Sequence, residues 1–201
     1  MVNLENGKNR KSFMRISRNN KGFTLVELMI TIAVAVILVT VAIPSFRELI
    51  ARNDLVTVTN AWVSAINTAR AEAVKLNQPV VLCGEDKVPT SGLGAGCDTS
   101  VAGEVRYLPR DGGSEEALYE AVVDSVSSPL AVASSATVRF RGDGIGYPGD
   151  NLGSPYDTPN GGDPAVVVLC SSAFSTDNAR SVQLIAGSTV QVATQTLASC
   201  P

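Results

Sequence analysis

Residues 21–46 read KGFTLVELMITIAVAVILVTVAIPSF and hold the decisive pattern of the chain. Gly22 separates a basic stretch from an apolar one, and a lone carboxylate, Glu27, lies five residues beyond it. The 19 residues from Leu28 to Phe46 carry no charge. With the residues before Glu27 they are long enough for a membrane-spanning helix, which needs about 20 apolar residues. No small-residue cleavage site follows the run, as one would in a secretory signal, so we expect the apolar segment to stay in the mature protein.

Beyond Arg47 the pattern changes from uniformly apolar to amphipathic. Apolar residues now recur at steps of three and four, as they do on one face of a helix: Trp62, Ala65, Ile66, Ala69, Ala73 and Leu76. We therefore predict one long helix from about Thr24 to Leu76. Pro44 lies inside it and lacks a backbone N–H, which predicts a kink or local melting near Ala42 and Ile43. Pro79 predicts the end of the helix.

The rest of the chain has the composition of strands and turns. Strands are predicted at Pro79–Cys83, Glu104–Pro109, Ala117–Val126, Ala136–Arg141, Ala165–Cys170, Ser181–Ile185 and Ser188–Val192. Ala186-Gly187 predicts a hairpin between the last two. Residues 142–164 contain many glycines and prolines and predict a long surface loop. A long N-terminal helix followed by an antiparallel β-sheet domain is an α+β architecture.

Charge is distributed unevenly between the first 22 residues and the remainder. The first 22 residues hold six basic side chains and one acid, a balance typical of a segment that stays on the cytoplasmic side. Of the 16 basic and 19 acidic residues in the chain, ten basic and eighteen acidic residues then remain, a net charge of −8. Such an acidic domain has no general attraction for nucleic acid or anionic lipid.

The four cysteines, Cys83, Cys97, Cys170 and Cys200, allow three pairings. Their spacing favours two locally closed disulfides, Cys83–Cys97 and Cys170–Cys200. Disulfides persist in the periplasm, where the membrane topology above places this part of the chain. A zinc site is disfavoured, because it would need close cysteine pairs and histidine partners, and the chain has no histidine.

Enzymatic chemistry finds no support in the sequence. Without histidine there is no His-based catalytic triad, and no serine has the Gly-x-Ser-x-Gly surroundings of a nucleophile elbow. Glu115-Glu116 is predicted to be a solvated edge. The acids of residues 142–164 do not follow the calcium-loop spacing, so a solvated loop is favoured there over a calcium site. We therefore predict no catalytic residue, no metal site and no cofactor.

Gly22-Phe23-Thr24-Leu25-Val26-Glu27-Leu28 resembles the prepilin signature of type IV pilins and type II secretion pseudopilins. Residues 68–83, TARAEAVKLNQPVVLC, are similar to the helix-to-strand junction of the FimT/FimU/GspH group of minor pilins. The resemblance implies a pilin fold. It also implies that a prepilin peptidase cuts after Gly22 and methylates Phe23, and that Glu27 pairs with the free amine of Phe23 on a neighbouring subunit.

The resemblance further implies a structural subunit rather than an enzyme. Its expected parts are a leader peptide over 1–22, a transmembrane and filament-core helix over 23–46, and a periplasmic domain over 47–201. Its expected partners are the prepilin peptidase, the major pilin, other minor pilins and the inner membrane, with DNA unfavoured. The chain would be stored in the inner membrane and then assembled into the pilus fibre. A FimU-like role in initiating or capping a type IV pilus is favoured, and the alternatives are a FimT-like DNA-binding pilin and a GspH-like pseudopilin of type II secretion.

Overall fold

The computed structural model describes residues 22–85, 93–111, 113–149, 153–156 and 165–201. Contacts within the chain divide it into two units, with the boundary between Ala42 and Ile43, inside the long helix. The described strands, β1 to β9, all belong to the second unit. We describe each unit by itself.

Helix α1 spans Leu25–Leu76, close to the predicted bounds. Every described side chain from Leu25 to Ile50 is exposed. From Ala51 onward one face becomes buried, and it includes the residues that the amphipathic pattern selects: Leu55, Val58, Trp62, Ala65, Ile66, Ala69 and Ala73. A kink or local melting was predicted near Ala42 and Ile43; the helix continues without a break through Pro44, so of these two the melting does not occur.

The C-terminal end of α1 is closed by backbone hydrogen bonds. The N–H of Gln78 donates to the carbonyl of Ala73 (3.3 Å), and that of Asn77 donates to the carbonyl of Val74 (3.2 Å). Asn77 has a φ of 48°, which gives the left-handed geometry of a Schellman cap. Pro79 then prevents the helix from continuing, so the chain turns directly into the first strand.

The first sheet has five antiparallel strands in the order β3-β2-β1-β5-β6. Their bounds are Glu116–Tyr119 for β3, Val105–Tyr107 for β2, Val80–Leu82 for β1, Val138–Phe140 for β5 and Gly146–Pro148 for β6. The central strand β1 follows α1 directly, and all three of its residues are buried.

The second sheet has four antiparallel strands in the order β4-β7-β8-β9. Their bounds are Leu130–Ser135 for β4, Ala165–Ser171 for β7, Ala179–Ile185 for β8 and Thr189–Gln195 for β9. Ala186, Gly187 and Ser188 connect the last two strands as the predicted hairpin, and the first two of these residues have φ values of 49° and 66°. β7 is the most buried of these strands.

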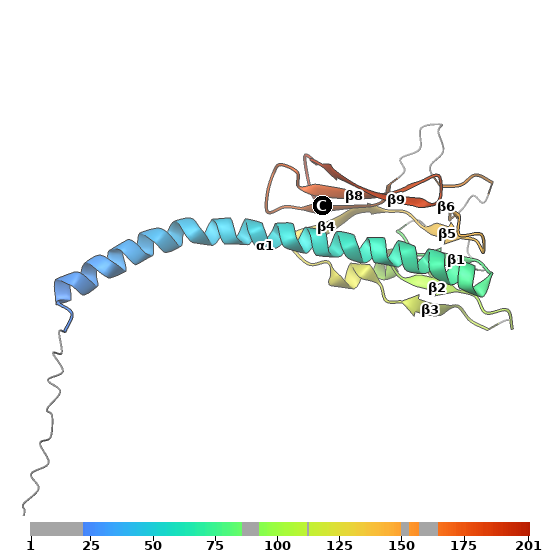
Figure 1. The fold of residues 1–201 in the computed structure, drawn as a ribbon, viewed down its shortest axis with the longest axis horizontal. Coiled ribbons are helices and arrows are strands. Elements are labelled where there is room, and N and C mark those ends of the chain that lie inside the picture. The colour runs from blue at the N-terminus through green and yellow to red at the C-terminus, as the bar shows by residue number, and fades with distance from the viewer. Residues whose placement is uncertain (1–21, 86–92, 112, 150–152, 157–164) are drawn as a thin grey trace, which may run out of the picture. The chain divides into compact units, whose positions relative to one another are not determined.

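The hydrophobic core lies between α1 and the strands of both sheets (Figure 1). Trp62, Phe140 and Leu169 are among its largest fully buried side chains, and they come from α1, β5 and β7. The amphipathic half of α1 therefore packs against protein, and the α+β class is confirmed.

Three details of the strand prediction are wrong. The predicted strand over Ala117–Val126 is strand only as β3, and Val122–Ser125 forms a 3₁₀ helix, η2. The structure has two sheets where one was expected, and it includes the unpredicted strands β4 and β6. β6 lies inside the predicted loop, where it pairs with β5. Gly146 of β6 fits against the side chain of Leu184, where an added Cβ would come within 2.7 Å. That contact depends on a residue distant in sequence.

Candidate processing and assembly site

Thr24 caps the N-terminus of α1. Its hydroxyl accepts a hydrogen bond from the N–H of Glu27 (3.2 Å), and its carbonyl accepts one from the N–H of Leu28 (3.1 Å). Thr24 and Glu27 have the spacing of a capping box, in which the N-cap hydroxyl meets the N–H of the third helical residue. Thr-x-x-Glu before an apolar run is the ordinary sequence signal of such a cap, and the cap was not among the predicted features.

Gly22 has no structural reason to be glycine in the folded chain. Its φ is outside the positive range, and a Cβ built on it would meet no atom within 4 Å. The strained or crowded glycines of this protein are different: Gly103 has a φ of +85°, and a Cβ at Gly84 would lie 2.2 Å from the backbone of Ala136. A requirement for glycine at position 22 would therefore come from another molecule that binds this segment, and not from the fold of the chain itself.

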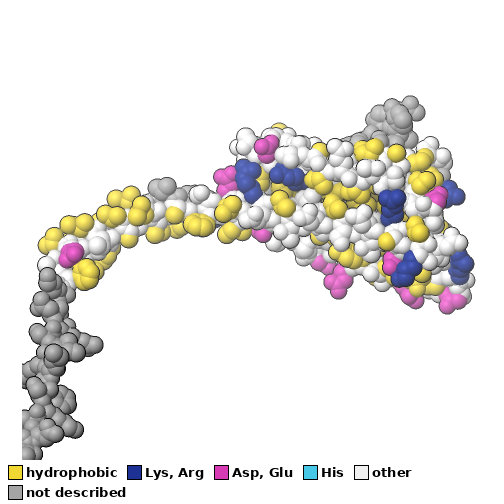
Figure 2. Space-filling model, viewed as in Figure 1, with side chains coloured by type: hydrophobic (Ala, Val, Ile, Leu, Met, Phe, Trp, Pro, Cys, Tyr) yellow, Lys and Arg dark blue, Asp and Glu magenta, His cyan; other side chains and the backbone are white. Residues whose placement is uncertain are grey.

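Next to Gly22 lies an uncovered apolar surface. Phe23 is 79% exposed, and large apolar side chains follow it around α1, among them Leu25, Met29, Ile32, Val36, Leu38 and Phe46. Figure 2 shows this stretch of helix covered mainly by hydrophobic side chains. Of the helices in the described residues, α1 is the one with a segment long and apolar enough to cross a membrane, and none of that segment is buried.

Glu27 is the carboxylate of this apolar stretch and lies in the first turn of α1. The positive end of the helix dipole favours an acid at this position. Glu27 is exposed, and the ion pairs found among the described residues do not include it. Phe23 and Glu27 thus lie close together in sequence at the start of an exposed apolar helix.

The four cysteines are joined in the pairing that their spacing favours. Cys83 is bonded to Cys97, with the Cα atoms 5.0 Å apart, and Cys170 is bonded to Cys200, with the Cα atoms 5.8 Å apart. The first disulfide closes the segment after β1, and the second attaches the C-terminal tail to β7.

Charged side chains hold the segment around Cys97 against the first sheet. Arg106 of β2 pairs with Glu104 (3.1 Å) and with Glu115 (3.5 Å). Glu115 also accepts a hydrogen bond from the N–H of Gly94, and the guanidinium of Arg139 donates to the carbonyl of Leu93 (2.6 Å). Glu115 is therefore a partly buried ion-pair partner, and the prediction of a solvated edge is wrong for it.

Other residues singled out in the sequence have local structural roles. Arg141 lies over the ring of Tyr147, 5.3 Å from its centroid, and the carboxylate of Asp143 accepts a hydrogen bond from the N–H of Ile145 (2.9 Å). Asp150, Asp157 and Asp163 lie outside the described residues. Within the described part of the chain, no three Cys, Asp or Glu residues are placed to hold a metal ion.

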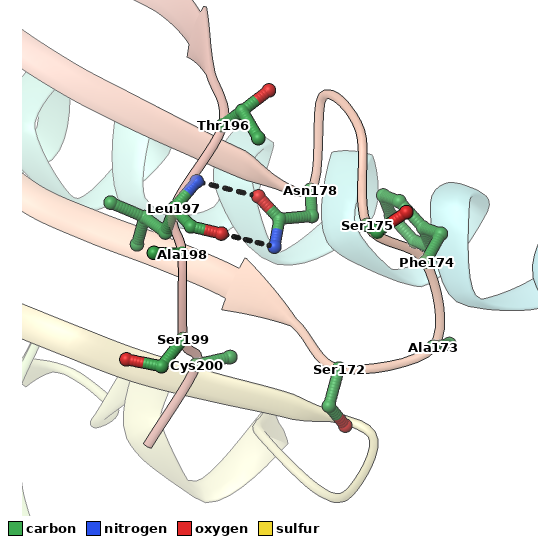
Figure 3. Close-up of a pocket in the computed structure, with 10 residues that line it drawn as sticks. All are labelled: Ser172, Ala173, Phe174, Ser175, Asn178, Thr196, Leu197, Ala198, Ser199 and Cys200. Carbon is green, nitrogen blue, oxygen red and sulfur yellow. Dashed lines mark hydrogen bonds between the residues drawn. The ribbon is translucent and has the colours of Figure 1, made fainter.

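A shallow hollow of about 570 Å³ lies beside the C-terminal tail, between residues 172–175 and 196–200. Asn178 is nearly buried and holds the tail: its amide donates to the carbonyl of Leu197 (3.1 Å) and accepts from the N–H of Leu197 (2.8 Å). In Figure 3 the hydroxyls of Ser172, Thr196 and Ser199 point in different directions. They form no convergent polar site, so the features that point to function lie at the start of α1.

Two families of known proteins match the chain. The family described as Type II transport protein GspH matches residues 58–189, and the family described as Prokaryotic N-terminal methylation motif matches residues 17–43. A Pseudomonas aeruginosa protein named "Fimbrial protein" is 31% identical over 127 residues, which cover 62% of this chain and 82% of that protein. A second protein of that name and organism is 43% identical over 61 residues, which cover 30% of this chain and 39% of that protein. No solved structure matches the chain.

Proposed function

The chain belongs to the GspH family of type IV pilins and pseudopilins, and on this premise we propose that it is a minor pilin of the FimU kind. Such a subunit helps to initiate and cap the assembly of a type IV pilus. The family is a structural one and not an enzyme family. The observation that carries the proposal is the exposed apolar half of α1, which begins at Leu25, three residues after Gly22, and continues as one helix into the residues that pack in the core.

We propose that a prepilin peptidase cleaves after Gly22 and methylates Phe23. Residues 1–22 are then the leader, 23–46 the membrane and filament-core helix, and 47–201 the periplasmic domain. Two features support this division. Gly22 is not required by the fold, and both disulfides lie in the part that would occupy the oxidising periplasm.

We propose that Glu27 pairs with the N-terminal amine of Phe23 on a neighbouring subunit. An unpaired carboxylate in an apolar environment is costly, so a charged residue in a membrane segment usually has a partner. Cleavage after Gly22 would create an amine on Phe23, four residues before Glu27 in the sequence. Pairing between subunits would then both satisfy Glu27 and set the register of one helix against the next.

A GspH-like role in type II secretion is the second candidate, favoured by the description of the family that matches residues 58–189. The names of the two similar P. aeruginosa proteins favour a pilus instead. Deletion of the chromosomal copy distinguishes the two roles. A pilus subunit predicts loss of surface pili with secretion unchanged, and restoration by the wild-type copy. Normal pili together with lost secretion would establish the pseudopilin role.

A further inference from the structure

β9 is an edge strand with an open side. It pairs with β8 through seven consecutive residues, Thr189 to Gln195, without a bulge. Within the described part of the chain, the hydrogen bonds of its backbone are those of this pairing. The outward N–H and C=O groups of such an edge are a template for another strand.

This edge lacks the usual protection against pairing. No charged residue occurs from Ser181 to Pro201, and β9 contains no proline. The other described sheet edges differ: β3 carries Glu116, β4 has an irregular register at Val132 and Ser134, and β6 is three residues long and ends at Pro148. Proteins commonly blunt a sheet edge with charge, proline, a bulge or short length. Among the described strands, β9 is the long edge without any of these.

Both ends of β9 are held in place. Before its start, the carbonyl of Ser188 accepts a hydrogen bond from Arg70 of α1 (2.7 Å). Beyond its end, Asn178 holds Leu197 through two hydrogen bonds (Figure 3). The disulfide between Cys200 and Cys170 also fixes the tail. An edge that is already ordered loses little conformational entropy when a partner binds.

These contacts also give the direction of β9 relative to α1. The start of β9 lies beside Arg70, whereas its end lies beside Asn178, four residues beyond Phe174, which lies under the guanidinium of Arg52 at 4.2 Å. β9 therefore runs opposite to α1 within the second unit. β4 runs the other way, because three successive antiparallel pairings separate the two strands.

The direction of β9 relative to α1 restricts which strand of a neighbouring subunit can pair with it. Subunits of one filament carry their helices with a common polarity, so antiparallel pairing of β9 with β9 of a second copy would reverse one of the two helices. A strand that runs in the same direction as α1, as β4 does in this chain, can pair antiparallel with β9 while the helices of both subunits keep the same polarity. We infer that the outer edge of β9 binds an extended, uncharged edge strand of a neighbouring pilin, which points along α1 and continues the four-stranded sheet antiparallel to β9. This inference rests on the proposed function as a filament subunit.

Cysteine cross-linking in cells tests the pairing. The four natural cysteines are all bonded, so Val192→Cys adds a single free thiol to the edge. Val74→Cys is the matched control, because Val192 is 45% and Val74 is 51% exposed. With a thiol-reactive benzophenone, which on irradiation inserts into nearby C–H bonds and needs no lysine on the partner, we expect an adduct of Val192→Cys with a β-strand peptide of another pilin, and little adduct from Val74→Cys. An adduct between two copies through position 192, or equal adducts from both variants, would overturn the inference.

A charge at the edge supplies the second test. We expect Val192→Lys to remove most of this chain from sheared pili and Val74→Lys to leave its incorporation unchanged. Mass spectrometry of the membrane fraction must show both variants cleaved after Gly22, with both disulfides intact. A Val192→Lys protein that is processed, folded and incorporated like the wild type would overturn the inference. Failure of processing in the wild-type chain would instead contradict the proposed function.

Discussion

At the residue scale, the start of α1 combines two roles in four residues. Thr24 closes the helix by accepting from the N–H of Glu27, and the side chain of Glu27 remains exposed. The cap fixes where the helix begins, and therefore where the Glu27 carboxylate lies along the helix axis. The same short segment therefore sets the helix boundary and places the charge that we propose to pair with a neighbouring subunit.

We predict that Glu27→Ala is processed after Gly22 and reaches the membrane but is absent from sheared pili, because its charge partner in the filament is lost. Glu48→Ala is the matched control: Glu48 is an exposed carboxylate on the same helix, paired with Arg52 at 2.8 Å. Exposed pairs of this kind contribute at most about 1 kcal/mol, so this variant should be incorporated normally. Immunoblots of sheared pili and membranes measure both. Equal incorporation of the two variants would refute the role of Glu27.

A second residue-scale prediction concerns Asp98, the N-cap of the 3₁₀ helix η1, Thr99–Val101. Hydrogen bonds from the hydroxyl (2.5 Å) and the N–H (2.8 Å) of Ser100 lower the pKa of Asp98 below its ordinary value of 3.8. Because the folded-state pKa is lowered, the stabilisation is present above pH 3.8 and is lost as the pH falls through the folded-state pKa. NMR titration of the carboxyl carbon should show a midpoint below 3.8, which Ser100→Ala raises. A wild-type midpoint at or above the ordinary value would contradict the cap.

At the element scale, α1 changes its surroundings along its length. Up to Ile50 its described side chains are exposed, and from Ala51 one face is buried in the core. Ala65, Ala69 and Ala73 lie one turn apart on that face and are fully buried. Their small side chains allow the helix backbone to approach the strands closely, since protein interiors leave few voids.

We predict that Ala69→Leu destabilises the domain by about 1–3 kcal/mol, because a larger side chain overpacks this contact. Ala71→Leu makes the same change on the exposed face of the helix and should alter stability little. Denaturant unfolding of the full-length protein in detergent, followed by the fluorescence of Trp62, measures both. An equal free energy of unfolding for the two variants would show that the α1 interface tolerates the added volume.

At the scale of the whole molecule, charge opposes one alternative function. Residues 23–201 have a net charge of −8, and Arg180, the last basic residue, donates to the carbonyls of Asp177 (3.2 Å) and Ala179 (3.1 Å). Useful affinity for DNA needs several phosphate contacts from basic side chains. We therefore predict that the processed full-length protein, in neutral detergent, does not shift duplex DNA at physiological salt. A shift with steep salt dependence would support the FimT-like DNA-binding role instead.

The bounds and two faces of α1 and most of the strands could be predicted from the sequence. The processing site after Gly22 is read from the sequence in the same way and stays a prediction. Each of these is encoded in a local pattern: helical periodicity, β-branched runs, or a glycine beside a charge boundary. Glu27 and the cysteine spacing were likewise visible in the sequence alone.

The division of the strands between two sheets, and the edge that remains open, could not be predicted from the sequence and became visible only in the folded structure. β6 pairs with β5 and places Gly146 against Leu184 of β8, and the ion pair of Glu115 depends on Arg106 of β2. The Asn178 clamp depends on the return of the chain at Leu197. These features join residues that are distant in sequence, so no local period records them. The open edge of β9 belongs to the same group, because a strand becomes an edge only through the order of its neighbours.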